Sequence, residues 1–372
     1  MDFVHQKVDS SSLSKPIDLE PQSDENSEQS AIEAVCAALS ATKRPAILVD
    51  CLVSRFGATR AVQDITNHLK FPTFSTSMGK SIVDEKTNAF FYGTYNGKVC
   101  PHWMHNYIEN ESDLVLEFGS LLSDSNTGGH SREIASQKLI SVHPNMVVCF
   151  GKSYESVSMK SFLEKLHKRL LKTSFIEPAS LVVPPSQEKE TSDQITQDYI
   201  WHRLAAFLRP DDVLIAESGT AQFGFPDTTL PQNTTYITQV YYGSIGYSVG
   251  ACLGAAIAKR EEQSEGRVVL VVGDGSLQLT VQEVGTMIRL GLKNIIIIVI
   301  NNRGYTIERA IHGPEKAYND ITPYNHQLML LFFNHPSGRE SSREARSRSE
   351  LETILNSPGF ADAEALQLSG KM

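Results

Sequence analysis

Short apolar runs alternate along the first half of the chain with segments whose apolar residues recur every three to four positions. The apolar runs predict short strands at residues 45–51, 71–77, 113–120 and 138–144. The periodic segments predict amphipathic helices at residues 30–42, 59–70 and 156–173. Strands that alternate with helices are typical of βαβ units. The pattern therefore predicts an α/β domain at 27–177, after an irregular polar segment at 1–26.

The same alternation resumes after residues 178–194, a stretch rich in proline, serine and charge that predicts an interdomain linker. Strands are predicted at 211–217, 267–273 and 294–300, and helices at 195–208, 243–258 and 279–291. The run from Ile295 to Ile300 is typical of a buried parallel strand. The predicted fold class is α/β, with two Rossmann-like, doubly wound parallel-sheet domains, the second at 195–372.

The predicted helix at 243–258 carries glycines at positions 246, 250 and 254. Small residues at four-residue spacing allow another backbone to approach closely. We therefore expect this helix to be buried.

Composition narrows the functional classes. The chain has 372 residues, of which 41% are hydrophobic, and a formal net charge of -9, which argues against a nucleic-acid partner. No apolar run approaches the roughly 20 residues of a membrane span, and the first 30 residues lack the apolar core of a secretory signal. Five widely spaced cysteines without a CxxC pair predict neither disulfides nor a zinc site. We expect a cytoplasmic protein.

Polar clusters follow three strands of the second domain, at 218–224, 274–276 and 301–308. The carboxyl ends of strands in an open α/β sheet form the usual ligand crevice. Asp274 and Asn302 offer oxygen ligands for a hard divalent cation, and the N–H groups of Gly275 and Ser276 can face a phosphate. Asp274 alone could equally be a turn or helix-capping carboxylate. Its combination with Asn302, one helix and one strand later, predicts a diphosphate and metal site.

These residues carry a resemblance to a known family. "GDGSLQLTVQEVGTMIRLGL" and "NNRGYTIERAIHGPEKAYNDI" resemble the fungal pyruvate decarboxylases, which are thiamine diphosphate-dependent 2-oxo acid decarboxylases. "ESGTAQFG", "QVYYGSIGYSVGACLGAA" and "FPTFSTSMGKSIVDE" extend the similarity. It covers residues 14–332 and implies that 27–177 is the family's central domain and 195–372 its diphosphate-binding domain.

The resemblance implies a role for each matching residue. Mg²⁺ is ligated by Asp274, the side chain of Asn302 and the carbonyl of Gly304. The diphosphate is held by Gly275, Ser276, Asn302, Arg303, Gly304, Tyr305, Thr306 and Ile307. Ser218, Thr220, Gly243, Ser244 and Ile245 meet the rings, Ile245 as the wedge that bends the cofactor, and Glu308 is the catalytic carboxylate. The implied reaction converts a 2-oxo acid, pyruvate foremost, to an aldehyde and CO₂ on thiamine diphosphate.

The chain departs from the family in several places. Residues 1–30 contain no match to the family's N-terminal pyrimidine-binding domain, which carries its cofactor-activating glutamate. The C-terminal end also departs, and we expect a truncated domain whose sheet lacks its final strand and exposes an edge. Residues 293–302 are one residue longer than the family pattern, which predicts a bulge. Arg55 matches a region linked to activation by substrate, whereas Cys51 lies one position away; an effector contact and a solvated loop residue both remain open for Arg55.

Three functional hypotheses remain open. The first is a decarboxylase chain that is inactive alone and acts in a homo-oligomer or with full-length subunits that supply the missing domain. The second is a non-catalytic, truncated paralogue that associates with full-length decarboxylase. The third is an acetolactate synthase-like thiamine enzyme. Dinucleotide binding is disfavoured because no GxGxxG follows a strand and opens a helix.

Overall fold

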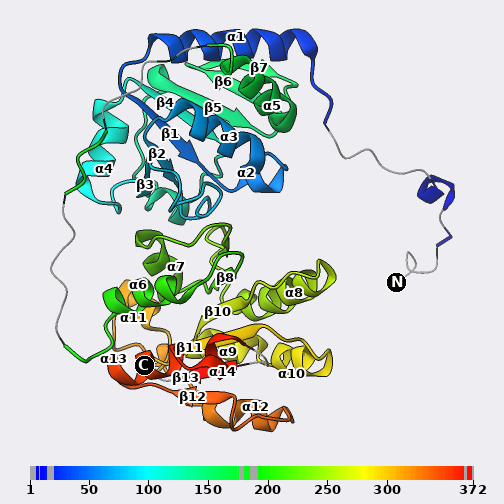
Figure 1. Ribbon diagram of the computed structural model, residues 1–372, viewed down its shortest axis with the longest axis vertical. Coiled ribbons are helices and arrows are strands. Elements are labelled where there is room, and N and C mark those ends of the chain that lie inside the picture. Colours follow the sequence, from blue (N-terminus) through cyan, green and yellow to red (C-terminus); the bar gives the residue numbers. More distant parts are fainter. Residues whose placement is uncertain are drawn as a thin grey trace.

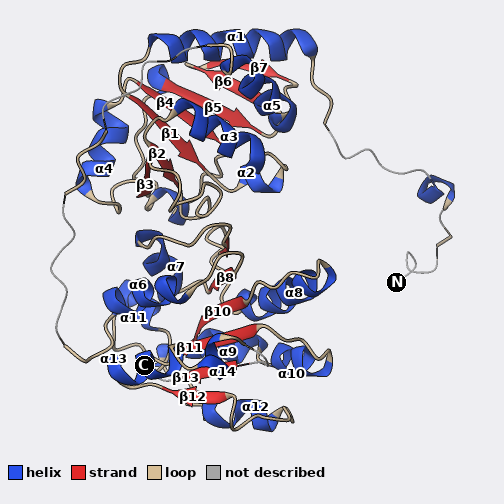
Figure 2. Ribbon diagram, viewed as in Figure 1, coloured by secondary structure: helices blue, strands red, loops and turns tan. Residues whose placement is uncertain are grey.

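The computed structural model describes residues 6–7, 9–14, 21–173, 175, 180–184, 192–363 and 367–370. Within these ranges the chain forms two α/β units, and Figure 1 shows the N-terminal unit above the C-terminal unit. Figure 2 shows the strands gathered into one sheet in each unit, with helices beside them. The predicted α/β fold class is confirmed.

The N-terminal unit contains a seven-stranded sheet in the order β3-β2-β1-β4-β5-β6-β7. Its strands are β1 Pro45–Val49, β2 Thr73–Ser75, β3 Phe91–Thr94, β4 Leu114–Phe118, β5 Leu139–His143, β6 Met146–Cys149 and β7 Lys152–Glu155. Its helices are α1 Glu25–Ala41, α2 Leu52–Arg55, α3 Thr59–Leu69, α4 His102–Asn106 and α5 Met159–Leu170.

This first sheet is not parallel throughout, because β6 and β7 pair antiparallel with their neighbours. Two residues, Pro144 and Asn145, separate β5 from β6, which is too short for a crossover helix. Phe150 and Gly151 separate β6 from β7 with φ values of 53° and 84°. Positive φ at both central residues is the requirement of a type I′ hairpin turn. Turn chemistry therefore explains the departure from the predicted parallel sheet.

The C-terminal unit contains a six-stranded sheet in the order β12-β13-β11-β10-β8-β9, and every pair is parallel. Its strands are β8 Val213–Ala216, β9 Thr235–Ile237, β10 Val268–Gly273, β11 Ile295–Ile300, β12 Ser342–Glu344 and β13 Gln367–Gly370. Its helices are α6 Gln197–Phe207, α7 Thr220–Gly224, α8 Tyr247–Glu261, α9 Asp274–Thr280, α10 Gln282–Arg289, α11 Thr306–His312, α12 Met329–Phe332, α13 Arg348–Leu355 and α14 Pro358–Ala361.

Two expectations about this sheet are wrong. The final strand is present, because β13 pairs with β11 on one side and with β12 on the other. Its backbone satisfies the free hydrogen-bonding edge of β11, and the short β12 forms the edge instead. The predicted bulge is also absent, since β10 and β11 stay in register from Val268 opposite Ile295 to Gly273 opposite Ile300.

The central strands of this sheet are buried on both faces. Successive side chains of a strand point to opposite faces, so β11 contributes alternate residues to two separate cores. Ile296, Ile298 and Ile300 join the core that contains α6 and α13. Ile295, Ile297 and Val299 join the core that contains α8 and α10. The continuous apolar run of β11 is thus explained by burial between two helical layers.

Helix α8 is buried on one face only. Val249, Cys252 and Ala256 lie in the core, whereas Gly250 and Gly254 are exposed. A Cβ atom at either glycine would meet no atom within 4 Å. The prediction of a buried helix is therefore wrong at Gly250 and Gly254, whereas Gly246, at the start of the helix, is buried and a Cβ there would lie 2.8 Å from Leu279.

The segment at 1–26, predicted to be irregular, contains a short 3₁₀ helix at Ser11–Ser14, and the α/β structure begins and ends close to the predicted domain limits. Helix α1 begins at Glu25, and α5 ends at Leu170. Residues 180–184 and 192–194 of the predicted linker form neither helix nor strand, and the remainder of that linker lies outside the described residues. Among the helices described, none has the length and apolar character that crossing a bilayer demands.

A buried ion pair joins the two units. The Nζ atom of Lys80 donates to Glu85 Oε2 at 2.9 Å and to the Thr228 carbonyl of the C-terminal unit at 2.6 Å. Glu85 Oε2 also accepts from the backbone N–H of Leu230 at 2.8 Å. Both charged side chains are fully buried. Both charged side chains thus hydrogen-bond to the backbone of the C-terminal unit, Lys80 as donor and Glu85 as acceptor, and these bonds hold the two units together.

Candidate functional site

A cavity of about 300 Å³ lies at the carboxyl ends of β8, β10 and β11. It is lined by Glu217, Ser218, Gly219, Thr220, Ala221, Ile245, Gly273, Asp274, Gly275, Ser276, Ile300, Asn302, Gly304, Tyr305, Thr306, Ile307, Glu308, Tyr318 and Asn319. Polar residues meet here because the strands are parallel and their connections lie at the same edge. Of the residues predicted to hold cofactor or metal, only Gly243, Ser244 and Arg303 are outside this lining.

Oxygen atoms gather at one end of the cavity. Asp274 begins α9 and is buried, and its Oδ1 and Oδ2 accept from the N–H groups of Gly275 and Gly304, both at 3.0 Å. The side-chain amide of Asn302 lies 2.8 Å from the Gly304 carbonyl and 3.3 Å from Asp274 Oδ1, with its nitrogen as the donor to both. A half-turn of this amide would present its oxygen instead, beside the Asp274 carboxylate and the Gly304 carbonyl, and such oxygens are the ligands that a hard cation prefers.

Burial shifts the acidity of this cluster. Desolvation raises the pKa of Asp274, and the hydrogen bonds from Gly304 and Gly275 partly offset that rise. The described residues contain no group of three or more His, Cys, Asp or Glu side chains able to hold a metal. A cation at Asp274 therefore depends on the amide and carbonyl oxygens of Asn302 and Gly304.

Close backbone approach shapes the floor of the cavity. A Cβ atom at Gly275 would lie 2.7 Å from the ring of Tyr305, and one at Gly304 would lie 2.3 Å from the Asn319 carbonyl. Gly304 also has a φ of 110°, which side chains rarely tolerate. Asn319 is fully buried, and neither polar atom of its amide has a hydrogen-bond partner among the described residues. The site thus combines a glycine-lined cradle with an unsatisfied amide on its wall.

The opposite wall comes from the end of β8 and from the loop before α8. Ser218 is buried and donates its hydroxyl to the Gln239 carbonyl at 2.9 Å, while Thr220 begins α7. Ile245 lines the cavity with 41% of its surface exposed. Gly243 and Ser244 belong to the same exposed loop. Gly243 donates its N–H to Gln239 Oε1 at 3.0 Å, which ties the loop to the β9 side.

Glu308 lies on α11 at the mouth of the cavity. Its Oε2 lies 2.8 Å from Nδ1 of His312, one helical turn further on. Arg309, the next residue of the helix, forms an ion pair with Asp320 at 2.9 Å. Glu308 is therefore paired with a histidine, and its carboxylate remains partly accessible.

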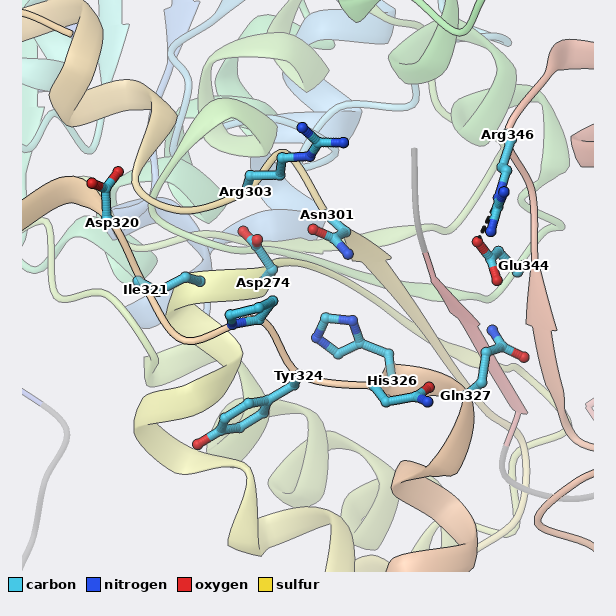
Figure 3. Close-up of a pocket in the computed structure, with 12 residues that line it drawn as sticks. Asp274, Asn301, Arg303, Asp320, Ile321, Tyr324, His326, Gln327, Glu344 and Arg346 are labelled. Carbon is cyan, nitrogen blue, oxygen red and sulfur yellow. Dashed lines mark hydrogen bonds and ion pairs between the residues drawn. The ribbon is translucent and has the colours of Figure 1, made fainter. Parts of the chain in front are cut away.

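A second cavity of about 930 Å³ shares the wall formed by Asp274. Figure 3 shows Asp274, Asn301 and the ring of His326 around this opening, with Arg303 above them. Arg303 has a positive φ of 65°, and its side chain lines this second cavity instead of the first. His326 is buried, its Nε2 has no partner among the described residues, and burial lowers its pKa.

The predicted effector residue lies in the other unit. Arg55 ends α2 and is exposed. The neighbouring Cys51 is buried against Met78 and Val240, and desolvation raises the pKa of its thiol to about 12. All five cysteines are free. The thiol of Cys51 is thus un-ionised at neutral pH, which removes its nucleophilic form.

Several cavity residues escaped the sequence analysis, notably Glu217, Tyr318 and Asn319. Glu217 directly precedes Ser218 at the end of a predicted strand, so the argument that selected polar residues at strand ends could also have selected Glu217. Tyr318 and Asn319 follow α11 by several residues, and their place in the cavity depends on how the chain folds back.

Two family models match the chain. The model of the thiamine pyrophosphate enzyme central domain matches residues 32–166. The model of the thiamine pyrophosphate enzyme C-terminal TPP binding domain matches residues 218–359, which include the whole lining of the first cavity except Glu217.

Similar proteins include fungal enzymes with curated names. Pyruvate decarboxylase of Aspergillus terreus is 39% identical over 370 residues, which cover 99% of this chain and 64% of that protein. Pyruvate decarboxylase of Candida albicans is 39% identical over 373 residues, covering 98% and 65%. Pyruvate decarboxylase isozyme 1 of Saccharomyces cerevisiae is 38% identical over 370 residues, covering 98% and 65%. The chain thus spans just under two thirds of the length of these relatives.

Among solved structures, a candidate thiamin diphosphate-dependent enzyme from Mycobacterium smegmatis is similar with a TM-score of 0.66. The match covers 95% of this chain and 65% of that one at 18% sequence identity. At 18% sequence identity, this similarity shows a shared fold and nothing further.

Proposed function

This chain belongs to the thiamine pyrophosphate enzymes, and on that premise we propose that its C-terminal unit binds thiamine diphosphate and Mg²⁺. We propose pyruvate decarboxylation to an aldehyde and CO₂ as the reaction in which it takes part. The names of the similar fungal proteins favour pyruvate over other 2-oxo acids. The observation that carries the proposal is the convergence of the Asp274 carboxylate, the Asn302 amide and the Gly304 carbonyl at the sheet edge.

The metal would be held by oxygens of these three groups. The Asn302 amide lies beside the Asp274 carboxylate and the Gly304 carbonyl, and turning its oxygen toward them would complete a set of oxygen ligands that suits a hard cation. The diphosphate would lie in the cradle of Gly275, Ser276 and the segment from Asn302 to Ile307. Most of that segment lines the cavity, and the close approach at Gly275 and Gly304 leaves no room for side chains there.

The rings would lie against Thr220 and the loop that carries Ile245. Ser218 would act indirectly, because its hydroxyl is engaged by the Gln239 carbonyl. When bound, the coenzyme supplies the electron sink for the electrons left by departing CO₂. Glu308 would hold or deliver a proton at its carboxylate, and His312 at 2.8 Å would orient that carboxylate. Arg303 would contribute its backbone alone, since its side chain lines the neighbouring cavity.

One side of the proposed site is open and apolar. Tyr242 is 80% exposed, and Tyr241, Ile245 and Leu279 are each more than 40% exposed. Such surface beside a ligand cavity is typical of a face that another chain or domain covers. We propose that another chain covers this face, either a second copy of this chain or a full-length subunit, and that a full-length subunit would complete the pyrimidine end of the site. The 372 residues alone would then bind coenzyme without turnover.

Calorimetry tests the metal and diphosphate site directly. Thiamine diphosphate is titrated at saturating Mg²⁺ into the unaltered chain, into Asp274→Asn and into the control Asp362→Asn, an exposed residue paired with Arg209. We expect binding to the chain and to the control, and a loss of at least about 10–100-fold in Asp274→Asn, because removing a metal ligand should cost no less than removing a group that supports one. Equal binding by all three proteins would contradict the proposed site.

Turnover separates catalytic from non-catalytic roles. Release of CO₂ from pyruvate is measured for the chain alone, and then for the chain mixed with an inactive full-length decarboxylase that retains its pyrimidine domain. We expect no release alone and measurable release in the mixture. Association without release would favour the second hypothesis, a non-catalytic subunit.

A further inference from the structure

Glu217 is a buried carboxylate whose contacts are all hydrogen-bond donors. It directly follows β8, and only 1% of its surface is exposed. Its Oε1 accepts from the N–H groups of Ser218 at 2.8 Å and Gly246 at 3.0 Å. Its Oε2 accepts from the hydroxyl of Ser248. No cation is among the described partners, so Glu217 acts through hydrogen bonds to the loop before α8.

This loop is held at both ends by groups near β8. At its start, Gln239 Oε1 accepts from Tyr242 and Gly243, and the Gln239 carbonyl accepts from Ser218. At its end, Gly246 donates to Glu217, and the Gly246 carbonyl accepts from Thr280 at 2.6 Å. Between these two attachments, Tyr242, Ser244 and Ile245 are exposed. The position of Ile245 in the cavity wall therefore depends on its neighbour Gly246.

We propose that Glu217 is a positioning residue that fixes Gly246, and with it Ile245, at the wall that receives the ring half of the coenzyme. The proposal rests on the proposed function, because it assumes that the rings lie against Ile245. The length of the Glu217 side chain decides whether it can fix the loop, because the backbone N–H groups of Ser218 and Gly246 converge on one of its carboxylate oxygens. Burial raises the pKa of Glu217 by desolvation, while its hydrogen bonds act in the opposite direction.

Two conservative substitutions separate the effect of side-chain length from the effect of charge. Glu217→Gln keeps the length of the side chain and an oxygen for Ser218 and Gly246, and the Ser248 hydroxyl can reverse its role as donor. Glu217→Asp keeps the charge but is shorter by one methylene, about 1.5 Å, and cannot reach both N–H groups. A matched control is Glu262→Asp, an exposed residue at the C-terminal end of α8.

The experiment compares two ligands on the whole 372-residue chain. Thiamine diphosphate and inorganic pyrophosphate are each titrated with Mg²⁺ by calorimetry, since pyrophosphate lacks the rings. We expect Glu217→Asp to weaken thiamine diphosphate binding about tenfold, as an unsatisfied N–H and a displaced loop imply. Pyrophosphate binding should stay unchanged, which also shows that the diphosphate cradle is folded. Glu217→Gln and Glu262→Asp should match the unaltered chain.

Each other outcome has a defined meaning. Unchanged thiamine diphosphate binding in Glu217→Asp overturns the positioning role. Equal weakening by Glu217→Gln overturns it as well, because charge would then be the property that matters. Equal weakening of both ligands in Glu217→Asp indicates general structural damage and also overturns it. If the unaltered chain binds pyrophosphate but gains nothing from the rings, this inference fails alone. If it binds neither ligand, the proposed function fails with it.

Discussion

Gly304 combines two constraints at a single residue. Its φ of 110° disfavours any side chain, and the Asn319 carbonyl occupies the space that a Cβ would need. The same Asn319 carbonyl accepts from the N–H of Tyr305 at 3.1 Å, so it cannot withdraw without losing a hydrogen bond. Gly313 offers a comparison, since its φ is 100° but no atom lies within 4 Å of its Cβ position.

Substituting these two glycines separates backbone strain from steric conflict. We expect Gly313→Ala to lower the free energy of unfolding by about 1 kcal/mol through its positive φ alone. Gly304→Ala should cost roughly 1–3 kcal/mol more, because the added methyl overpacks against the Asn319 carbonyl. Urea denaturation of the two variants measures the difference. Equal losses in the free energy of unfolding would mean that the segment around Asn319 shifts to accommodate the added methyl group at no cost in stability.

At the scale of elements, α8 presents glycines where a helix normally carries larger residues. Gly250 and Gly254 lie on its exposed face, and neither packs against anything in the described chain. Glycine inside a helix is less stable than alanine because it loses more backbone entropy on folding. Their presence therefore fits a close contact with residues outside this sequence, in line with the exposed apolar residues beside the cavity.

Alanine at both positions tests this interpretation. We expect Gly250→Ala/Gly254→Ala to raise the free energy of unfolding of the chain by about 1–2 kcal/mol in total. Association with a full-length decarboxylase should weaken, which analytical ultracentrifugation measures. Gly285→Ala in α10 is the control, since its Cβ would meet the Phe333 ring at 3.0 Å and no gain is expected. Unchanged association would contradict the interpretation of the exposed face.

The last long helix is clamped to the first helix of the same unit. Glu352 of α13 accepts from Nη2 of Arg203 at 2.9 Å and from the Tyr199 hydroxyl at 2.8 Å, both on α6. The Arg203 guanidinium lowers the pKa of Glu352, with Tyr199 contributing in the same direction. The clamp joins residues that lie 149 and 153 positions apart in the sequence.

The clamp has a defined pH dependence. Because the folded-state pKa of Glu352 lies below its ordinary value of 4.5, its stabilisation is present above pH 4.5 and is lost as pH falls through the lower value. Glu352→Gln should cost about 0.5–1 kcal/mol at pH 7, as for a partly exposed pair, and the cost should vanish in acid. Urea denaturation at several pH values, with exposed Glu340→Gln as control, measures this. A cost that persists in acid would indicate lost packing instead.

At the scale of the whole molecule, the two units are joined through buried charges. Interfaces between domains of one chain commonly permit motion, but here Lys80 and Glu85 each bind backbone atoms of the C-terminal unit. Ser81 adds a third link, since its hydroxyl accepts from the Tyr236 N–H at 2.9 Å. Separating the units would expose both charges and break these bonds, so we expect them to unfold together.

Removing the lysine charge tests that coupling. Lys80→Met leaves Glu85 buried without its cation, and we expect a loss of about 3–5 kcal/mol in stability. Calorimetric unfolding should change from one transition to two as the units uncouple. The control Lys98→Met removes an exposed pair with Glu133 and should cost no more than about 1 kcal/mol. A single transition in Lys80→Met would contradict the role of this pair.

Much of the architecture followed from local pattern, and the failures have specific causes. The run from Ile295 to Ile300 predicted a strand buried on two faces, because apolar periodicity reports burial directly. Antiparallel β6 and β7 were missed, because their direction depends on the turn at Phe150 and Gly151. Strand β13 was missed, because its place beside β11 depends on a pairing partner about 70 residues earlier in the chain.

The sequence by itself determined the α/β class and the polar residues that follow β8, β10 and β11, because periodicity and the spacing of strand ends are local properties. The resemblance to a family came from the matching motifs themselves. Tertiary structure alone decided that Arg303 faces a second cavity and that Glu217 holds the loop beside Ile245. Both outcomes depend on contacts between residues that are far apart in the sequence, and a local sequence pattern does not specify such contacts.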